Sequence, residues 1–311
     1  MAGAAYKFFL KRLMKQSKSL EQRGFTLLEL LVAVIIGTLI SSLLLFIVVE
    51  LVRANRREEV LTQTQQSMQR AMDYVTRDLG EAVFVYAEPS VVTDELDDLP
   101  AGSVPVVAFW RLDPVDITQA GSGIDCDASN ECTTLRVRQS SYTLVVYLLQ
   151  ANGGADIWEG PSRIIRYTLP TYQDITTLTL TDGYQDPSVP PSSFESWAPT
   201  ATATDGNAQV LTDYVDDIAL NSGATDCPDP AADYQRTPAD TDSFYTCILY
   251  TDLDGDGNRD EDVSTNKNVF VYLQGNPDNL AATGGPTSDA SRFPKLEAAV
   301  LVRGAIEKGA Q

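Results

Sequence analysis

Residues 23–29 read Arg-Gly-Phe-Thr-Leu-Leu-Glu, and residues 25–49 read FTLLELLVAVIIGTLISSLLLFIVV, with Glu29 as the only charge in that stretch. At about 1.5 Å per residue, a helix of this length reaches roughly 37 Å, which exceeds the bilayer hydrocarbon core of about 30 Å. The stretch is too long for the apolar region of an ordinary secretory signal, and no A-x-A cleavage site follows it. The sequence therefore predicts a membrane-spanning helix over 25–49.

A basic segment precedes this helix. Residues 1–24 contain six Lys or Arg residues against Glu21 alone, a net charge of +5. Because the whole chain has a net charge of −20, the residues after Gly24 carry −25. The positive-inside rule then predicts a cytoplasmic N-terminus, a single pass through the inner membrane and a periplasmic or extracellular C-terminal domain. A domain this acidic repels a phosphate backbone, so we expect no nucleic-acid partner. Keeping an exported domain soluble accounts for most of the acidity.

Glu29 is the unusual residue of the apolar stretch. A carboxylate within a membrane span is costly, and such residues are usually functional. If the chain is cut before Phe25, Glu29 lies one helical turn from a new α-ammonium group. The alternative is a carboxylate that extends to the membrane interface and has no further role.

The run from Arg23 to Glu29 resembles the processing motif of type IV pilins and of type II secretion pseudopilins. The resemblance implies that a prepilin peptidase cleaves after Gly24 and methylates the amine of Phe25. It also implies that Glu29 pairs with the Phe25 ammonium of a neighbouring pilin or pseudopilin during filament assembly, which offsets the cost of burying both charges. The late helix-breaking proline of many major pilins is missing here, which favours a minor component.

The polar segment that follows, 50–82, keeps a helical period. Apolar residues recur three or four positions apart in its second half and form one stripe, which we interpret as core packing: Met68, Met72, Val75, Leu79 and Ala82. Short runs rich in β-branched and aromatic residues then predict strands at 83–87, 104–112, 133–139, 142–149, 163–169, 176–181, 210–220, 244–250, 268–273 and 296–303.

The expected fold class is therefore α+β, with a long N-terminal transmembrane-plus-stem helix packed on an antiparallel β-sheet domain, as in pilins. The domain division is a cleaved leader at 1–24, a membrane helix at 25–49, an amphipathic stem at 50–82 and an exported β-rich domain at 83–311. Residues 183–207, rich in Pro and Ser, are expected to form a surface excursion.

Two further segments carry narrower resemblances. Residues 71–83 resemble the stem of the larger minor pseudopilins, the J-type of type II secretion and the PilW-type of type IV pili, and 294–304 resembles their final strand. The stem through Tyr86 is similar to the hormogonium polysaccharide secretion pseudopilins of filamentous cyanobacteria. These resemblances imply a minor subunit, with polysaccharide among the possible cargoes.

The cysteine and histidine content limits the disulfides, metal sites and catalytic groups that the chain can form. The four cysteines lie in or beside loops, and we favour the local disulfides Cys126–Cys132 and Cys227–Cys247 among three possible connectivities. Histidine is absent, which removes the commonest general base and metal ligand. With no G-x-S-x-G elbow or phosphate-binding loop either, we expect no enzyme.

An acidic run, 252–262, resembles the start of a DxDxDG calcium loop. Alternating carboxylates on a tight turn direct oxygens to one centre, and calcium takes six to eight of them. Val263 stands where an EF-hand has its bidentate Glu, so a later carboxylate must substitute for it; the alternative is a solvated acidic turn. The candidate structural calcium ligands are Asp252, Asp254, Asp256, Asn258, Asp260, Glu261 and Asp262.

The leading functional hypothesis is thus a minor pseudopilin or pilin that primes or assembles a filament for secretion, with polysaccharide as one cargo, or for motility. The alternative is a minor pilin at the filament tip, whose exported domain binds a surface or a glycan, with 183–207 as a candidate loop.

Overall fold

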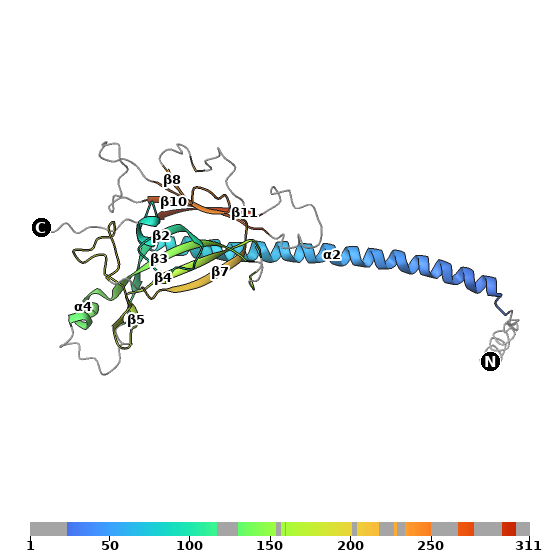
Figure 1. The fold of residues 1–311 in the computed structure, drawn as a ribbon, viewed down its shortest axis with the longest axis horizontal. Helices are drawn as coiled ribbons and strands as arrows, with labels where there is room; N and C mark the ends of the chain where they lie inside the picture. The colour runs from blue at the N-terminus through green and yellow to red at the C-terminus, as the bar shows by residue number, and fades with distance from the viewer. Residues whose placement is uncertain are drawn as a thin grey trace, which may run out of the picture. The chain divides into compact units, whose positions relative to one another are not determined.

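The computed structural model describes residues 24–116, 130–153, 157, 158, 160–200, 204–217, 227, 228, 234–249, 267–276 and 294–302. The chain forms two compact units, residues 1–58 and 59–311. One long helix and antiparallel sheets make up the described part, so the predicted α+β class is confirmed (Figure 1).

Helix α2 runs from Leu27 to Gly80, a length of 54 residues without interruption. Thr26 begins it, because the Glu29 backbone N–H donates to the Thr26 hydroxyl at 3.2 Å. Polar side chains within the helix bond back to its own carbonyls, as Thr38 does to Ile35 at 2.8 Å, so they do not break it. The helix ends at Gly80, two residues before the predicted end at Ala82.

The first sheet has five antiparallel strands in the order β1-β2-β3-β4-β7. The central strands β2 and β3 carry long apolar runs, which suit a sheet covered on both faces. The strands are β1 (Ala82–Val85), β2 (Ser103–Pro114), β3 (Ser140–Ala151), β4 (Ser162–Leu169) and β7 (Asn207–Val215).

The second sheet has four antiparallel strands in the order β11-β10-β9-β8. They are β8 (Tyr234–Thr237), β9 (Phe244–Leu249), β10 (Lys267–Gln274) and β11 (Lys295–Val302). A bridge between Val215 and Gly275 connects the two sheets. The short elements are α3 (Ser90–Thr93), α4 (Asn130–Arg138), β5 (Tyr172–Asp174) and β6 (Thr179–Leu180).

Two large hydrophobic cores, with a small cluster around Cys227, Tyr245 and Cys247, hold the described part of the second unit together. One core joins the stem stripe of α2, from Met68 to Leu79, to residues of both sheets. The other lies on the opposite face of the first sheet and is built around Trp110, whose indole N–H donates to the Tyr86 hydroxyl at 2.9 Å. The stripe of apolar residues predicted on the stem is therefore core packing.

The strand prediction for 133–139 is wrong, because this segment lies in helix α4. A strand would place Leu135 and Val137 on one face, but Leu135 is 3% exposed and Val137 is 82% exposed. Cys132 and Leu135, three residues apart, share the buried side, as on a helix. The β-branched Thr and Val residues suggested a strand, and packing against the domain overrides that propensity.

The segment 183–207 is more than the surface excursion that its composition suggests. Trp197 is 2% exposed and packs edge-on against Trp110, with ring centroids 5.4 Å apart. Its indole N–H donates to the Gln185 carbonyl at 2.7 Å. The segment covers the second face of the first sheet, which explains why the central strands are apolar on both sides.

Candidate functional site

The cleavage motif lies at the start of α2. Gly24 and Phe25 precede the first helical residue, and Phe25 is exposed. Thr26 caps the helix, and Glu29 occupies the third helical position, which is the Thr-x-x-Glu pattern of a capping box. The cap is a role for Thr26 that the motif analysis missed, although the Thr-Leu-Leu-Glu spacing was its signal. A carboxylate in the first turn also complements the helix dipole.

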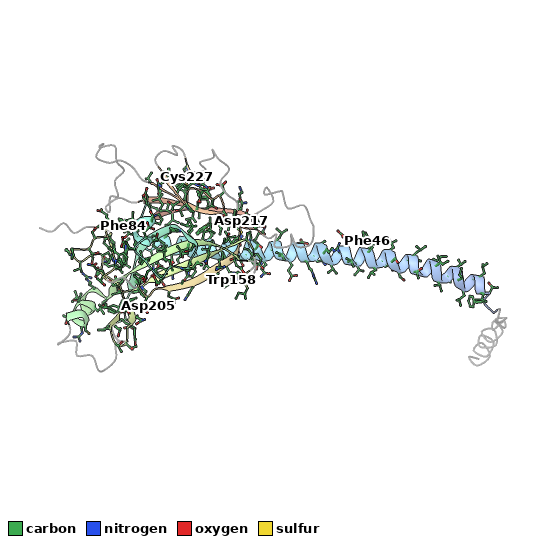
Figure 2. All side chains as sticks on the ribbon, in the orientation of Figure 1. Phe46, Phe84, Trp158, Asp205, Asp217 and Cys227 are labelled. Carbon is green, nitrogen blue, oxygen red and sulfur yellow. A yellow bond between two sulfur atoms is a disulfide. The ribbon has the colours of Figure 1, made fainter. Side chains whose placement is uncertain are left out.

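The large apolar side chains in the first half of this helix, from Leu27 to Val52, are exposed. In the described residues, α2 alone is long and apolar enough to span a membrane; its most apolar 18-residue window has a mean hydropathy of 2.9 and is 0% buried. Side chains such as Phe46 project from the helix all along its apolar part (Figure 2). The helix is thus a candidate membrane anchor, and its surface is also free to contact other subunits.

A candidate membrane helix behind a Gly-Phe-Thr-Leu-Leu-Glu motif is typical of prepilin-type proteins. Residues 20–45 match the model of the prokaryotic N-terminal methylation motif. This motif is the signature of type IV pilins and pseudopilins, so it supports a pilin-like subunit that a prepilin peptidase processes and that assembles with other such subunits. No curated protein and no solved structure matches the chain.

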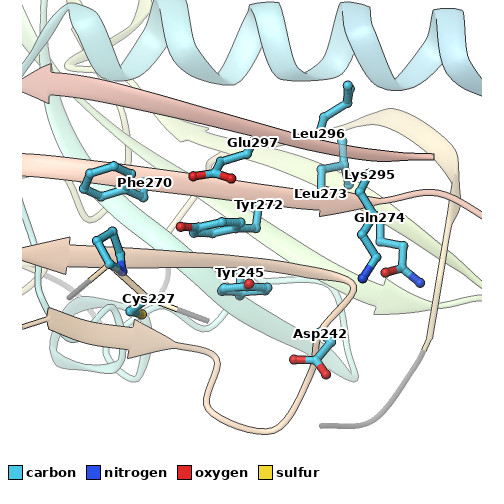
Figure 3. Close-up of a pocket in the computed structure, with 11 residues that line it drawn as sticks. Cys227, Asp242, Tyr245, Phe270, Tyr272, Leu273, Gln274, Lys295, Leu296 and Glu297 are labelled. Carbon is cyan, nitrogen blue, oxygen red and sulfur yellow. The ribbon is translucent and has the colours of Figure 1, made fainter. Parts of the chain in front are cut away.

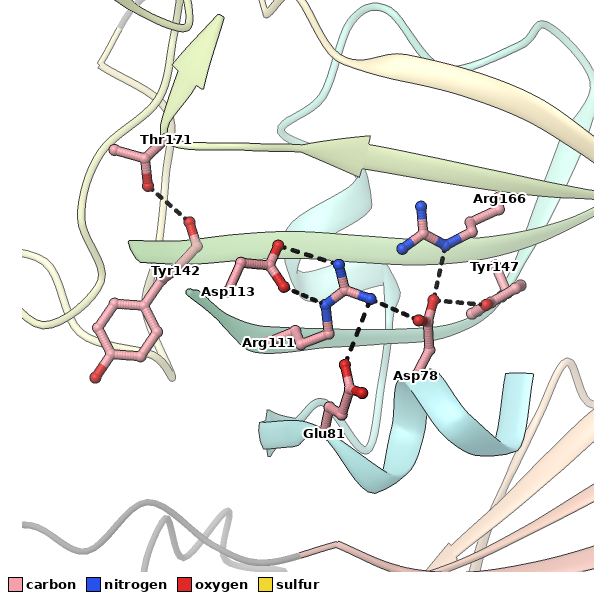
Figure 4. A network of polar contacts seen from close by, with 8 residues as sticks. All are labelled: Asp78, Glu81, Arg111, Asp113, Tyr142, Tyr147, Arg166 and Thr171. Carbon is pink, nitrogen blue, oxygen red and sulfur yellow. Dashed lines mark hydrogen bonds and ion pairs between the residues drawn. The ribbon is translucent and has the colours of Figure 1, made fainter. Parts of the chain in front are cut away.

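The last turn of α2 is joined to the first sheet by a network of ion pairs around Asp78, whose side chain is almost fully buried (Figure 4). One carboxylate oxygen pairs with Arg111 Nη1 of β2 at 2.6 Å. The other accepts from Arg166 Nε of β4 at 2.7 Å and from the Tyr147 hydroxyl of β3 at 2.8 Å. A single helical carboxylate therefore contacts three adjacent strands.

The electrostatics of this network depend on the charge of Asp78. Arg111 is held between Asp78 and Asp113, whose carboxylate it contacts at 2.6 Å. Burial and the neighbouring Asp78 carboxylate raise the pKa of Tyr147 well above its usual range, so its hydroxyl stays a donor. Asp78 was missed as a site residue, although its spacing of seven from Ala71 places a carboxylate on the buried face of the stem.

The cysteines and the acidic loop are described only in part. Cys227 and Cys247 form a disulfide with their Cα atoms 5.7 Å apart, which is one of the two expected pairs. Cys132 is also disulfide-bonded and fully buried, while Cys126 lies outside the described residues. The candidate calcium ligands from Asp252 to Asp262 lie outside them too, so the calcium site stays a prediction.

Proposed function

We propose that the chain is a minor pseudopilin or pilin subunit that primes or assembles a type II secretion-like or type IV pilus-like filament. The observation that carries the proposal is the uninterrupted helix α2, apolar and exposed through its first half, with Glu29 in its first turn behind the methylation motif. The same helix serves as the inner-membrane anchor before assembly and as the contact between subunits afterwards. The protein works by assembly and is not an enzyme.

The minor rank and the cargo are proposed from the narrower resemblances of the stem and the final strand. The resemblance of residues 71–83 and 294–304 to the larger J-type and PilW-type minor subunits supports a minor position. The similarity of the stem to polysaccharide secretion pseudopilins makes polysaccharide the cargo that we propose for a secretion filament. The basic leader supports a cytoplasmic N-terminus with the sheet domain on the far side of the membrane.

Processing is tested by mass spectrometry of the mature N-terminus. We expect a chain that begins with N-methylated Phe25, and Gly24→Val should leave the leader attached, because the peptidase needs a small residue there. An intact leader on the wild-type protein, in cells whose prepilin peptidase is active, would contradict the assignment.

Assembly is tested with Glu29→Val. The apolar residue should insert and be cleaved normally, but incorporation into filaments should fall, because the Phe25 ammonium of a neighbour loses its partner. Glu50→Val, at the end of the apolar stretch on the same helix, is the matched control and should assemble as wild type. Equal assembly of both variants would argue against the pairing role.

A second candidate function is binding by the exported domain at the tip of a filament. The observation that favours it is a hollow lined by aromatic and polar side chains on the second sheet.

A further inference from the structure

The hollow lies on the face of the second sheet that is turned away from the core (Figure 3). Along β11, Leu296, Ala298 and Val300 pack against the core, and the alternate residues Lys295 and Glu297 point to the hollow side. The volume is about 670 Å³, which is in the range of small-ligand pockets, roughly 300–1,000 Å³.

Aromatic rings form one wall of the hollow. The rings of Tyr245 and Tyr272, on neighbouring strands, are stacked with centroids 4.6 Å apart and an interplanar angle of 9°. The guanidinium of Arg236 lies 3.8 Å from the Tyr245 ring centroid. Phe270 is half-buried beside them, and the Cys227–Cys247 disulfide adjoins the rings. The rings are thus held in place before any ligand arrives.

Polar groups of both signs line the rest of the hollow. Gln274 lies at the end of β10 opposite Lys295, and Glu297 lies opposite Tyr272. Asp242 is already paired with Arg236, so its charge is balanced within the protein. Lys295 and Glu297 are both exposed and oppositely charged. The hollow is therefore close to neutral in a domain that is strongly acidic overall.

We propose that this hollow binds a neutral carbohydrate, of the kind found in an uncharged polysaccharide. The negative face of an aromatic ring attracts the slightly positive C–H face of a pyranose. Tyr245 is buried between Tyr272 and Arg236, so the partly exposed rings of Phe270 and Tyr272 would make this contact.

Sugar hydroxyls both donate and accept, and the exposed part of the lining offers the ammonium donor of Lys295 and the carboxylate acceptor of Glu297; the buried Gln274 amide is already bonded to Asp216 at 2.7 Å. A glycan hydroxyl can therefore pair with each of the two charged groups without leaving a buried charge bare.

Other ligand classes fit less well. A phosphate or a uronate would lie against the carboxylates of Glu297 and Asp242, and a polycation would meet Lys295. A purely apolar ligand would remove the charged groups of Lys295 and Glu297 from water without offering them a partner. This binding activity goes beyond filament assembly and needs neither cleavage nor Glu29.

The test uses the full chain in a detergent that has no sugar headgroup. An array of neutral gluco-, manno-, xylo- and galacto-oligosaccharides is screened together with oligogalacturonate and hexalysine, and the best ligand is measured by calorimetry. We expect a neutral oligosaccharide to bind, and Glu297→Gln and Tyr272→Leu each to weaken it at least tenfold. Glu195→Gln, an exposed carboxylate outside the hollow, is the matched control and should bind as wild type.

Three results would overturn the proposal: no neutral oligosaccharide binds, the charged probes bind in preference, or binding survives in the variants of the hollow. If Tyr272→Leu does not fold, the exposed Glu297→Gln decides alone. Assembly is scored separately, because Glu29→Val should still bind the oligosaccharide and Glu297→Gln should still enter filaments.

Discussion

At the scale of single residues, Asp78 adds ion pairs and a hydrogen bond to the apolar packing between the stem helix and the first sheet. Both of its oxygens are occupied, by Arg111 on one side and by Arg166 and Tyr147 on the other. Replacing such a buried ion pair by apolar residues is often neutral, but removing one partner leaves bare charges in the interior. The contribution of Asp78 to stability is therefore best measured by a substitution that keeps the size of its side chain.

Asp78→Asn keeps the shape of the side chain and removes its charge. Two largely buried guanidinium groups then lose their shared counter-ion, and we expect the free energy of unfolding to fall by about 3 kcal/mol. Urea unfolding of the full chain in detergent, followed by tryptophan fluorescence, measures the loss. Asp73→Asn, on the exposed side of the same helix, should change it by less than about 0.5 kcal/mol. Similar effects of the two changes would show that the network adds little stability.

At the scale of elements, the β3–β4 loop comes close to β7 at Gly160. Gly160 has a φ of +77°, and an added Cβ would lie 2.9 Å from the Tyr214 Cα. Gly102, before β2, has almost the same φ of +78°, with nothing within 4 Å of an added Cβ. The two glycines share one backbone requirement and differ in the space around them.

Gly102→Ala should lower the free energy of unfolding by about 1 kcal/mol, because alanine is strained in the left-handed backbone conformation. Gly160→Ala should cost roughly 1–3 kcal/mol more, because the backbone of β7 must move to admit the methyl group. The difference between the urea unfolding midpoints of the two variants measures the effect of the close approach between Gly160 and β7. If the midpoints coincide, the loop yields freely and the packing there is loose.

How far the sequence predicts these elements depends on how local the signal is. The long helix follows from helical periodicity to within two residues at each end, and the strands β2, β3 and β4 follow from β-branched and aromatic runs bounded by turn residues. Helix α4 was missed because only its tertiary contacts distinguish Leu135 from Val137. The Asp78 network and the aromatic hollow each join residues from three strands, and no sequence window contains such a set.

At the scale of the whole molecule, calcium is the ligand predicted from the acidic run 252–262. Six carboxylates in this run repel one another without a cation. We expect calcium at 100 times its Kd to stabilise the full chain by about 2.7 kcal/mol, and magnesium to do less because it demands a tight octahedral shell.

Thermal unfolding with calcium, with magnesium and with chelator measures this effect. Asp254→Ala combined with Asp256→Ala should abolish the calcium response, and Asp94→Ala combined with Glu95→Ala, an exposed acidic pair elsewhere, should keep it. A wild-type protein whose melting temperature is the same in calcium and in chelator would leave the run as a solvated acidic turn.

The position of Asp78 has a mechanical consequence. Helix α2 is continuous from Leu27 to Gly80, so a pull on its first turns is passed along the helix to its last one. There the ion pairs to β2 and β4 and the hydrogen bond to β3 share the load across three strands, together with the apolar stripe from Met68 to Leu79 that packs in the core. Contacts strained in parallel must fail together, whereas contacts strained one after another fail singly. The contacts of Asp78 therefore help the stem helix to resist a pulling force. In a subunit that lacks the Asp78 charge, the sheets should separate from the helix under a smaller tension than in wild type.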